Sequence, residues 1–182
     1  MSAQQQLLDL LMTRSVRFGE FTLKSGKVSD LYVDARQTTL HPQGALLIAR
    51  LVLERLQPTV VGVGGPMSGA DPIAGAVAAL SAIEGPRPIA GFMVRKEPKG
   101  HGTQLWVEGL ANLPEGSPVC VVEDTTTTGG SLLTAIRHIE SSGLRVVQCI
   151  TVVDRSEGAI QTLADAGYTL EALVCRADLT GK

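Results

Sequence analysis

The segment VCVVEDTTTTGGSLLTAI, residues 119–136, decides how the rest of the sequence is interpreted. Its first four residues are apolar, as expected of a parallel strand that is covered on both faces. Two acids, Glu123 and Asp124, end this run, and threonines, glycines and a serine lead from them into a pattern typical of an amphipathic helix. The segment therefore predicts a buried strand, a polar loop and a helix in direct succession.

The polar loop in this segment has the composition of a phosphate-binding site. Gly129 and Gly130 let the chain turn so that its N–H groups converge, and the helix that follows adds the positive end of its dipole. Thr127, Thr128 and Ser131 supply hydroxyl donors at the same rim. We expect the loop to hold a monophosphate without a lysine. The two acids before it would accept hydrogen bonds from sugar hydroxyls and help to hold a magnesium ion that the substrate brings.

Outward from this segment, strand-like and helix-like patterns alternate along most of the chain. This alternation predicts an α/β fold with a mostly parallel sheet and helices on both faces. The runs FGEFTLKSG and LYVDAR, at 18–26 and 31–36, indicate a hairpin or paired edge strands. Strands are predicted over 60–63, 88–96, 119–124, 146–155 and 169–175, and helices over 4–14, 72–80, 130–142, 157–166 and from Pro42 to before Pro58.

Length and composition limit the kinds of function that this protein can have. The chain has 182 residues, 44% hydrophobic and 19% charged, which predicts one domain with its own core over residues 1–182. A net charge of -2 and only 3% aromatic residues argue against binding to nucleic acid or to anionic lipid. No apolar run approaches the ~20 residues that cross a bilayer, and the first residues lack the features of a secretory signal. Three cysteines within apolar runs are expected to be buried, reduced thiols in a cytoplasmic protein.

Two familiar nucleotide-binding motifs do not fit. A P-loop needs Gly-Lys followed by Ser or Thr, but Gly26-Lys27 is followed by Val28. The dinucleotide fingerprint begun by Gly62 and Gly64 has Met67 where its third glycine belongs. ATP hydrolysis and nicotinamide chemistry therefore lose support.

The acid pair followed by Thr-Thr-Gly at 127–129 closely resembles the signature by which type I phosphoribosyltransferases bind 5-phosphoribosyl pyrophosphate, PRPP. That family includes enzymes for purines and pyrimidines as well as regulators that only bind PRPP, so the signature implies a donor and leaves the acceptor open. The resemblance implies that PRPP is held by Glu123, Asp124, Thr125, Thr126, Thr127, Thr128, Gly129, Gly130 and Ser131.

Three further segments resemble orotate phosphoribosyltransferases in particular. FTLKSGKVSDLYVD at 21–34 is similar to their N-terminal motif, and FMVRKEPKGHGTQLWVEG at 92–109 to their mobile catalytic loop. VVDRSEG at 152–158 is similar to the segment whose arginine binds the orotate carboxylate, here Arg155. The resemblance runs from about Phe21 to Gly158.

This resemblance implies a Mg²⁺-dependent transfer of the phosphoribosyl group from PRPP to orotate, giving orotidine 5'-monophosphate and pyrophosphate in pyrimidine biosynthesis. It implies a hood of about residues 1–40 with C-terminal segments, and Mg²⁺ held mainly through PRPP. The enzyme would be a homodimer with Arg95, Lys99 and His101 acting across the interface and Lys96 in its own subunit. Lys24 and these four residues would contact PRPP. The implied catalytic residues are Lys99, His101 and Asp124, and the implied orotate-binding residues are Lys24, Tyr32, Val33, Thr127 and Arg155.

The sequence departs from the family pattern in two places. Ser29-Asp30-Leu31 stands where many members have Ser-Pro-Tyr, and Val33 replaces a frequent aromatic residue, so the pyrimidine face is expected to be less aromatic. Gly69, in the loop at 64–72 that matches the pyrophosphate loop, stands where some members have lysine. Backbone N–H groups of this loop are then expected to bind pyrophosphate.

Three other interpretations stay open at this point. A PRPP-sensing regulator would have lost the basic loop or gained a DNA-binding segment. A phosphoribosyltransferase for another base would lack the motifs of Lys24 and Arg155, because a purine has no carboxylate to bind. The third interpretation is that the chain works as one half of a complex with the decarboxylase that follows in the pathway.

Overall fold

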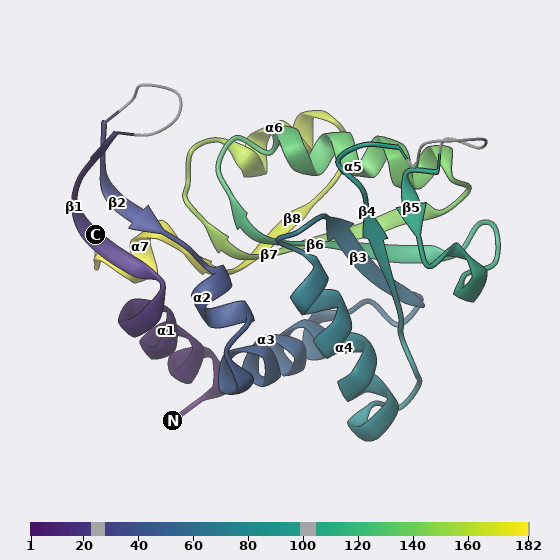
Figure 1. Ribbon diagram of the computed structural model, residues 1–182, viewed down its shortest axis with the longest axis horizontal. Coiled ribbons are helices and arrows are strands. Elements are labelled where there is room, and N and C mark those ends of the chain that lie inside the picture. Colours follow the sequence, from purple (N-terminus) through teal and green to yellow (C-terminus); the bar gives the residue numbers. More distant parts are fainter. Residues whose placement is uncertain (23–27, 99–104, 182) are drawn as a thin grey trace.

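A six-stranded sheet with the strand order β5-β4-β3-β6-β7-β8 forms the centre of this computed structural model, which describes residues 1–22, 28–98 and 105–181 (Figure 1). The strand β5 runs antiparallel to β4, and the other neighbouring strands run parallel. The predicted α/β fold with a mostly parallel sheet is therefore confirmed. The strands are β3 (Gly62–Pro66), β4 (Ala90–Val94), β5 (Val107–Glu108), β6 (Pro118–Thr126), β7 (Arg145–Asp154) and β8 (Leu170–Cys175).

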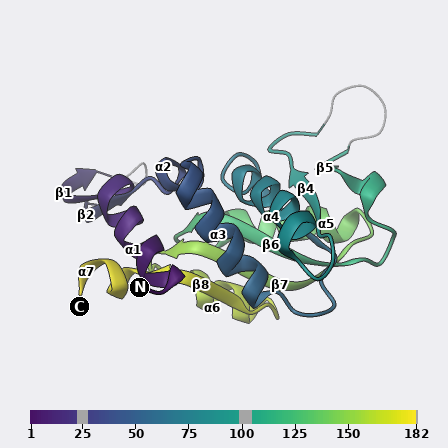
Figure 2. The same ribbon diagram turned by 90° about the horizontal axis from the view of Figure 1, so that it is seen from below.

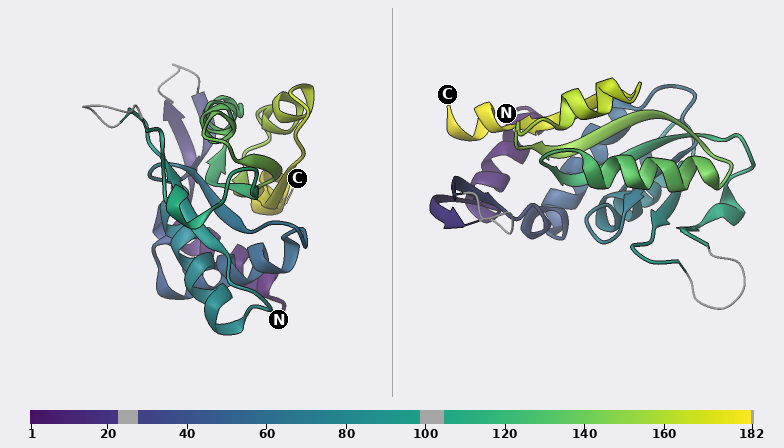
Figure 3. Two further views of the ribbon diagram at one scale, coloured as in Figure 1. Left: turned by 90° about the vertical axis from the view of Figure 1, so that its right-hand side faces the viewer. Right: turned by 90° about the horizontal axis from the view of Figure 1, so that it is seen from above.

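Helices cover both faces of this sheet. On one face lie α1 (Ala3–Arg14), α3 (Pro42–Arg55) and α4 (Asp71–Glu84), which stand in front of the strands in Figure 2. On the other lie α5 (Gly130–Ser141) and α6 (Ala159–Asp165), seen in the right panel of Figure 3. Within the described residues, none of the helices combines the length and the apolar character needed to cross a membrane.

The central strand β6 shows why the sheet needs both layers. Successive side chains of a strand point to opposite faces. Cys120 and Val122 accordingly belong to the core under α1, α3 and α4, whereas Val119 and Val121 belong to the core under α5. All four side chains are at most 1% exposed. The unbroken apolar run that predicted a doubly covered strand thus contributes to both cores.

A separate two-stranded antiparallel sheet precedes the main one in the described chain. It consists of β1 (Val16–Thr22) and β2 (Val28–Val33), as the two polar–apolar runs predicted. The residues after β2 form a short helix, α2 (Arg36–Thr39), and not the end of the strand. The last described element is another short helix, α7 (Arg176–Thr180), on the same side of the molecule as the hairpin (Figures 1 and 2).

The predicted bounds of the strand at 60–63 were wrong, because β3 begins at Gly62 and continues through Gly64 and Gly65 to Pro66. A Cβ atom on Gly64 would lie 2.2 Å from the carbonyl oxygen of Phe92. One on Gly65 would lie 2.0 Å from the carbonyl oxygen of Val122. The neighbouring strands therefore pack against bare backbone here, and the glycines are part of the strand and not of the turn after it.

Two side chains are less buried than their sequence pattern predicted. Cys175 is half-exposed, because it ends β8 and caps α7, whereas Cys120 and Cys149 are buried. The apolar spacing in the helix predicted over 130–142 places Leu133 with Leu132, Ile136 and Ile139 on the inward face, but Leu133 is half-buried, and Ala135 is buried instead. The helix turns its small residue toward the sheet at that point.

Candidate active site

The carboxyl ends of the parallel strands meet at one edge of the sheet, which is where α/β proteins bind their ligands. The segments at 67–70, 127–129 and 155–158 follow β3, β6 and β7 at that edge. The segment that follows β4 begins with Arg95. Four stretches that the sequence analysis singled out separately are therefore brought to a single edge.

A cavity of about 300 Å³ lies at this edge, on the side toward β2. It has the size of a small-molecule site. Among its lining residues are four that were predicted to bind PRPP (Lys96, Glu123, Asp124, Thr125) and two predicted to bind orotate (Tyr32, Val33). The remaining lining residues are Asp34, Ala35, Arg36, Met67, Ser68 and Gly69. Residues from both halves of the predicted site therefore line one cavity.

The acid pair at the end of β6 lies in a region of concentrated negative charge. Glu123 is 6% exposed, and its Oε1 atom accepts a hydrogen bond from the backbone N–H of Asp124 at 3.2 Å. Burial raises the pKa of Glu123 to about 8, and the charges of Asp124 and Asp71 act in the same direction. Burial also raises the pKa of Asp124. Ribose hydroxyls would supply further hydrogen-bond donors to the pair, and a bound cation would supply further positive charge.

The same acids explain why residue 69 is a glycine. A Cβ atom on Gly69 would lie 2.4 Å from Oε1 of Glu123 and 2.7 Å from Oδ1 of Asp124. The carboxyl groups of the buried Glu123 and the half-buried Asp124 therefore occupy the space into which a side chain at residue 69 would project. A lysine at residue 69 would require both carboxyl groups to move from these positions.

The described residues do not form a complete metal site by themselves. No group of three or more His, Cys, Asp or Glu side chains within the described ranges is placed to hold an ion. Two adjacent carboxyl groups, Glu123 and Asp124, are nevertheless the oxygen donors that Mg²⁺ prefers. This donor set fits an ion that arrives with other ligands already bound, such as the phosphates of a substrate.

The loop between β6 and α5 has the form of an anion cradle. Gly129 is in the left-handed conformation, with φ of 83°, and caps α5, whose first N–H groups have no partner within the helix. The carbonyl of Thr127 accepts a hydrogen bond from the N–H of Ala159 at 3.0 Å, which fastens the loop to α6. Thr128, Gly130 and Ser131 are exposed, and Thr127 is half-buried. Their donors are therefore within reach of a ligand at the helix start.

Two threonines of the signature differ in environment from these four residues. Thr126 is buried, and its hydroxyl donates to Oδ1 of Asp154 at 3.0 Å, which joins β6 to β7. The hydroxyl oxygen of Thr125 is buried at the cavity and has no hydrogen-bond partner among the described residues. Thr126 thus holds the sheet together, whereas Thr125 is available to a ligand.

Arg155 follows β7 and lies beside the hairpin, outside the lining of the cavity. It is 7% exposed, and its Nη2 atom lies 2.8 Å from Oε1 of Glu157 and donates to Oγ of Ser29 at 3.2 Å. Its Nε atom is buried with no hydrogen-bond partner in the described structure. A buried guanidinium N–H without an acceptor is the kind of group that a ligand carboxylate satisfies.

The basic residues after β4 divide between two cavities. Lys96 lines the cavity of the acid pair, and it also lines a second cavity of about 330 Å³ between β4 and α5. Arg95 lines the second cavity and forms an ion pair with Glu108 at 3.2 Å. The ring of Trp106 in that cavity stacks on the ring of His138, with centroids 3.8 Å apart. The other predicted site residues of the two basic segments, Lys24, Lys99 and His101, lie outside the described residues.

Sequence reasoning missed the two charged residues that follow β2. Asp34 and Arg36 line the acid-pair cavity and form an ion pair at 3.1 Å between Nε and Oδ1. The positive charge of Arg36 acts to lower the pKa of Asp124, against the larger effect of burial. The signal was the Asp-Ala-Arg run directly after the aromatic-containing strand. Its position at the site depends on α2, which no pattern predicted.

The fold and the site together define a class of protein. A parallel sheet whose central strand ends in a buried acid pair, followed by a threonine- and glycine-rich cradle at a helix start, is the architecture of a phosphoribosyltransferase of type I. The family model of the phosphoribosyl transferase domain matches residues 36–171, which include the acid pair and the cradle.

Comparison with known proteins identifies the family within this class. An orotate phosphoribosyltransferase of Rhodopseudomonas palustris is 45% identical over 175 residues, covering 94% of this chain and 93% of that protein. The crystal structure of the Mycobacterium tuberculosis orotate phosphoribosyltransferase in complex with Fe(III) dicitrate has a TM-score of 0.83 and 40% identity, covering 98% of this chain and 99% of that one. The structure of that enzyme with PRPP has a TM-score of 0.78 and 36% identity, with the same coverage. The chain belongs to the orotate phosphoribosyltransferase family.

Proposed function

We propose that this chain uses the acid-pair cavity to transfer the 5-phosphoribosyl group of PRPP to orotate, which gives orotidine 5'-monophosphate and pyrophosphate. As a member of the orotate phosphoribosyltransferase family it is a transferase of pyrimidine biosynthesis. The observation that carries the assignment of residues is the cavity itself. Glu123, Asp124 and Thr125 line it together with Tyr32 and Val33 of the hairpin, which supports the assignment.

In this proposal the end of β6 and the start of α5 bind the ribose phosphate. Glu123 and Asp124 accept hydrogen bonds from the ribose hydroxyls, which relieves the crowding of buried carboxyl groups. The N–H groups and hydroxyls of residues 127–131 bind the 5'-phosphate, supported by the helix dipole. The N–H groups of the loop after β3 bind pyrophosphate, since Gly69 supplies no side-chain cation.

Orotate would lie between the hairpin and the end of β7. Tyr32 and Val33 pack against the pyrimidine, and the guanidinium of Arg155 binds its carboxylate as a planar fork. The buried Nε atom without a partner supports this role. We also propose that residues 1–40 and α7 form the hood of this site, with Lys24, which lies between β1 and β2 in the sequence, as a contributing residue.

The reaction breaks the bond between the anomeric carbon and pyrophosphate and forms one from that carbon to a ring nitrogen of orotate. By analogy with glycoside chemistry the transition state is oxocarbenium-like, so no covalent nucleophile is required. Lys96 stabilises the negative charge on pyrophosphate, with Lys99 and His101 as the proposed charge or proton donors. Bound Mg²⁺, held by the phosphates of PRPP beside the acid pair, would neutralise part of the same charge.

We further propose a homodimer in which Arg95, Lys99 and His101 serve the partner's site. The placement of Lys96 at the acid-pair cavity and of Arg95 at the second cavity supports this division. Mixing an inactive Lys99→Ala protein with an inactive Asp124→Asn protein should restore part of the activity, because one site of the mixed dimer then has both residues. No recovery over a range of mixing times would count against a shared loop.

The proposed location is the cytoplasm. The three free cysteines support it, since cysteines in oxidising compartments usually pair. The proposed partners are PRPP, orotate and a second copy of the chain, without nucleic acid.

One assay tests the proposed reaction against its rivals. We expect orotate absorbance to fall in the presence of PRPP and Mg²⁺, and not when the Mg²⁺ is chelated. Adenine, guanine and uracil serve as competing acceptors. Turnover of one of these and not of orotate would favour a transferase for another base, whereas PRPP binding without turnover of any base would favour a regulator.

A further inference from the structure

Two arginines from the C-terminal half of the chain hold successive residues of β2. Arg155 donates to Oγ of Ser29 at 3.2 Å, and Arg176 forms an ion pair and hydrogen bond with Oδ1 of Asp30. The two contacts connect residues 126 and 146 positions apart in the sequence. They tie the hairpin to the end of β7 and to the start of α7.

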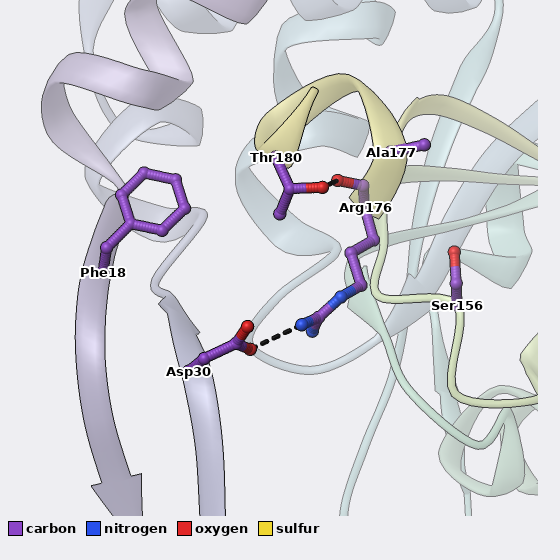
Figure 4. A pocket seen from close by; sticks show the side chains of 6 residues that line it. All are labelled: Phe18, Asp30, Ser156, Arg176, Ala177 and Thr180. Atoms are coloured by element: carbon purple, nitrogen blue, oxygen red, sulfur yellow. Dashed lines mark hydrogen bonds and ion pairs between the residues drawn. The ribbon is translucent and has the colours of Figure 1, made fainter. Parts of the chain in front are cut away.

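The contact of Arg176 with Asp30 spans a cavity of about 450 Å³. Figure 4 shows the guanidinium reaching across this cavity to the β2 carboxylate, with Phe18 and Ser156 on its sides. The side chain of Arg176 is 31% exposed and that of Asp30 is 77% exposed, so water and salt reach the pair. Such a pair adds little to overall stability. We therefore expect the ion pair to influence the position of the hairpin and to contribute little to the free energy of folding.

The arginine is held on a firm base, and the hairpin meets the core through Leu31, which is fully buried next to Asp30. The side chain of Leu179 fixes α7 to the core at 3% exposure, and the carboxylate of Asp178 accepts the N–H of Cys175 at 2.8 Å. The hairpin forms its own sheet, apart from the six-stranded one. Its base is attached where the N–H of Asp34 donates to the carbonyl of Ser15 at 2.9 Å. A contact farther along β2 is therefore well placed to set the hairpin's tilt.

That tilt matters because β2 also carries Tyr32 and Val33, which line the acid-pair cavity. Asp30 is two residues before Tyr32 on the same strand, so a movement at Asp30 is transmitted to the cavity wall. We propose that Arg176 and Asp30 form a positioning pair that holds the hairpin over the pyrimidine half of the site. The pair would set the affinity for orotate without touching substrate. The inference rests on the proposed function, because it assigns the pyrimidine to this wall.

The test compares conservative variants that remove one charge at a time. For Asp30→Asn and Arg176→Gln we expect the KM for orotate to rise about three- to fivefold, the range for a surface pair. The KM for PRPP and kcat should stay near wild type. The KM for orotate of the wild type should rise with ionic strength, and that of Asp30→Asn should respond less. An unchanged KM for orotate in both variants would overturn the proposal.

A charge exchange separates positioning from mere loss of structure. Asp30→Arg alone places two guanidinium groups together and should raise the KM for orotate further. Adding Arg176→Asp restores an opposite pair and should return the KM to within about twofold of wild type. A double variant no better than Asp30→Arg alone would contradict the pair. Glu84→Gln is the matched control, because it breaks an exposed ion pair between α3 and α4 at 2.9 Å, and it should leave the KM unchanged.

Hydrogen exchange of the β2 amides gives a measurement that does not depend on turnover. Faster exchange in Asp30→Asn than in wild type, with no change in α5, is the expected result. Equal exchange would contradict the positioning role even if the KM moved. A wild-type protein that consumes no orotate would instead refute the proposed function, and the exchange experiment would still decide whether the pair holds the hairpin.

Discussion

The Cβ position of Gly69 lies 2.4 Å from Oε1 of Glu123, closer than non-bonded carbon and oxygen atoms approach. A side chain at residue 69 therefore requires the carboxyl groups at the end of β6, or the loop after β3, to move. Replacing it with alanine must displace the loop or the acid. Because both are proposed to bind PRPP, we expect Gly69→Ala to raise the KM for PRPP about tenfold or more, a cost of ~1.4 kcal/mol.

A second glycine provides the control for this prediction. Gly75 lies within α4, and no described heavy atom outside its own helix and chain neighbours lies within 4 Å of its Cβ position. Gly75→Ala should leave the KM for PRPP unchanged and stabilise the helix slightly. Initial rates over a range of PRPP concentrations measure both variants, and equal KM values for the two would contradict the steric account.

The buried acid of the pair predicts how stability changes with pH. The pKa of Glu123 is raised by burial from an ordinary 4.5 to about 8, so the folded protein binds more protons than the unfolded chain between these values. Its contribution to the free energy of unfolding therefore falls as pH rises from about 4.5 to 8. Glu123→Gln cannot ionise and should lose less stability over that range.

Urea unfolding at pH 5.5 and pH 8 measures this difference. The free energy of unfolding of Glu123→Gln relative to wild type should be higher at pH 8 than at pH 5.5. Parallel profiles for the two proteins would show that Glu123 ionises normally in the folded state.

The loop between β6 and α5 predicts unequal effects on stability for alanine substitutions at two adjacent glycines. Gly129 has φ of 83°, and its Cβ would lie 2.8 Å from Cδ2 of Leu163. Gly129→Ala should therefore cost at least about 1–2 kcal/mol of unfolding free energy, from the left-handed backbone alone. Gly130 starts α5, and its Cβ would meet one atom, Oγ1 of Thr128, at 4.0 Å. Thermal or urea unfolding of Gly130→Ala should give a stability near wild type, and a similar loss in both variants would rule out this explanation.

The position of Arg155 predicts that its replacement by lysine weakens the binding of orotate selectively. Arg155→Lys keeps a positive charge and removes the planar fork, whose buried Nε atom has no partner among the described residues. Loss of a charged hydrogen bond of about 1.5–3 kcal/mol corresponds to a KM for orotate about ten- to a hundredfold higher. The KM for PRPP should change little.

Arg145→Lys is the control for that substitution, because Arg145 is exposed at the opposite end of the same strand. It should bind orotate as the wild type does. Equal rises in the KM for orotate and for PRPP in Arg155→Lys would indicate a general distortion of the site.

The sequence predicted the central elements because their signals are local. The apolar run of β6, the glycines before α5 and the spacing of apolar residues along α5 each lie within a few residues of one another. The bounds of β3 were missed because Gly64 and Gly65 look like a turn until Phe92 and Val122 are packed against them. Helices α2 and α7 were missed because each has four or five residues and no repeating pattern.

The sequence by itself determined the mostly parallel fold, the glycine-rich loop before α5 and the chemical groups along it, because the spacing of hydrophobic residues, the positions of glycines and the residue types are properties of short segments. Only the tertiary structure decided which of those groups share a cavity. It placed Lys96 at the acid pair and Arg95 away from it, and it brought Arg176 to Asp30 across the length of the chain. Such relations depend on how strands are ordered and how closely loops pack, and no local pattern records either.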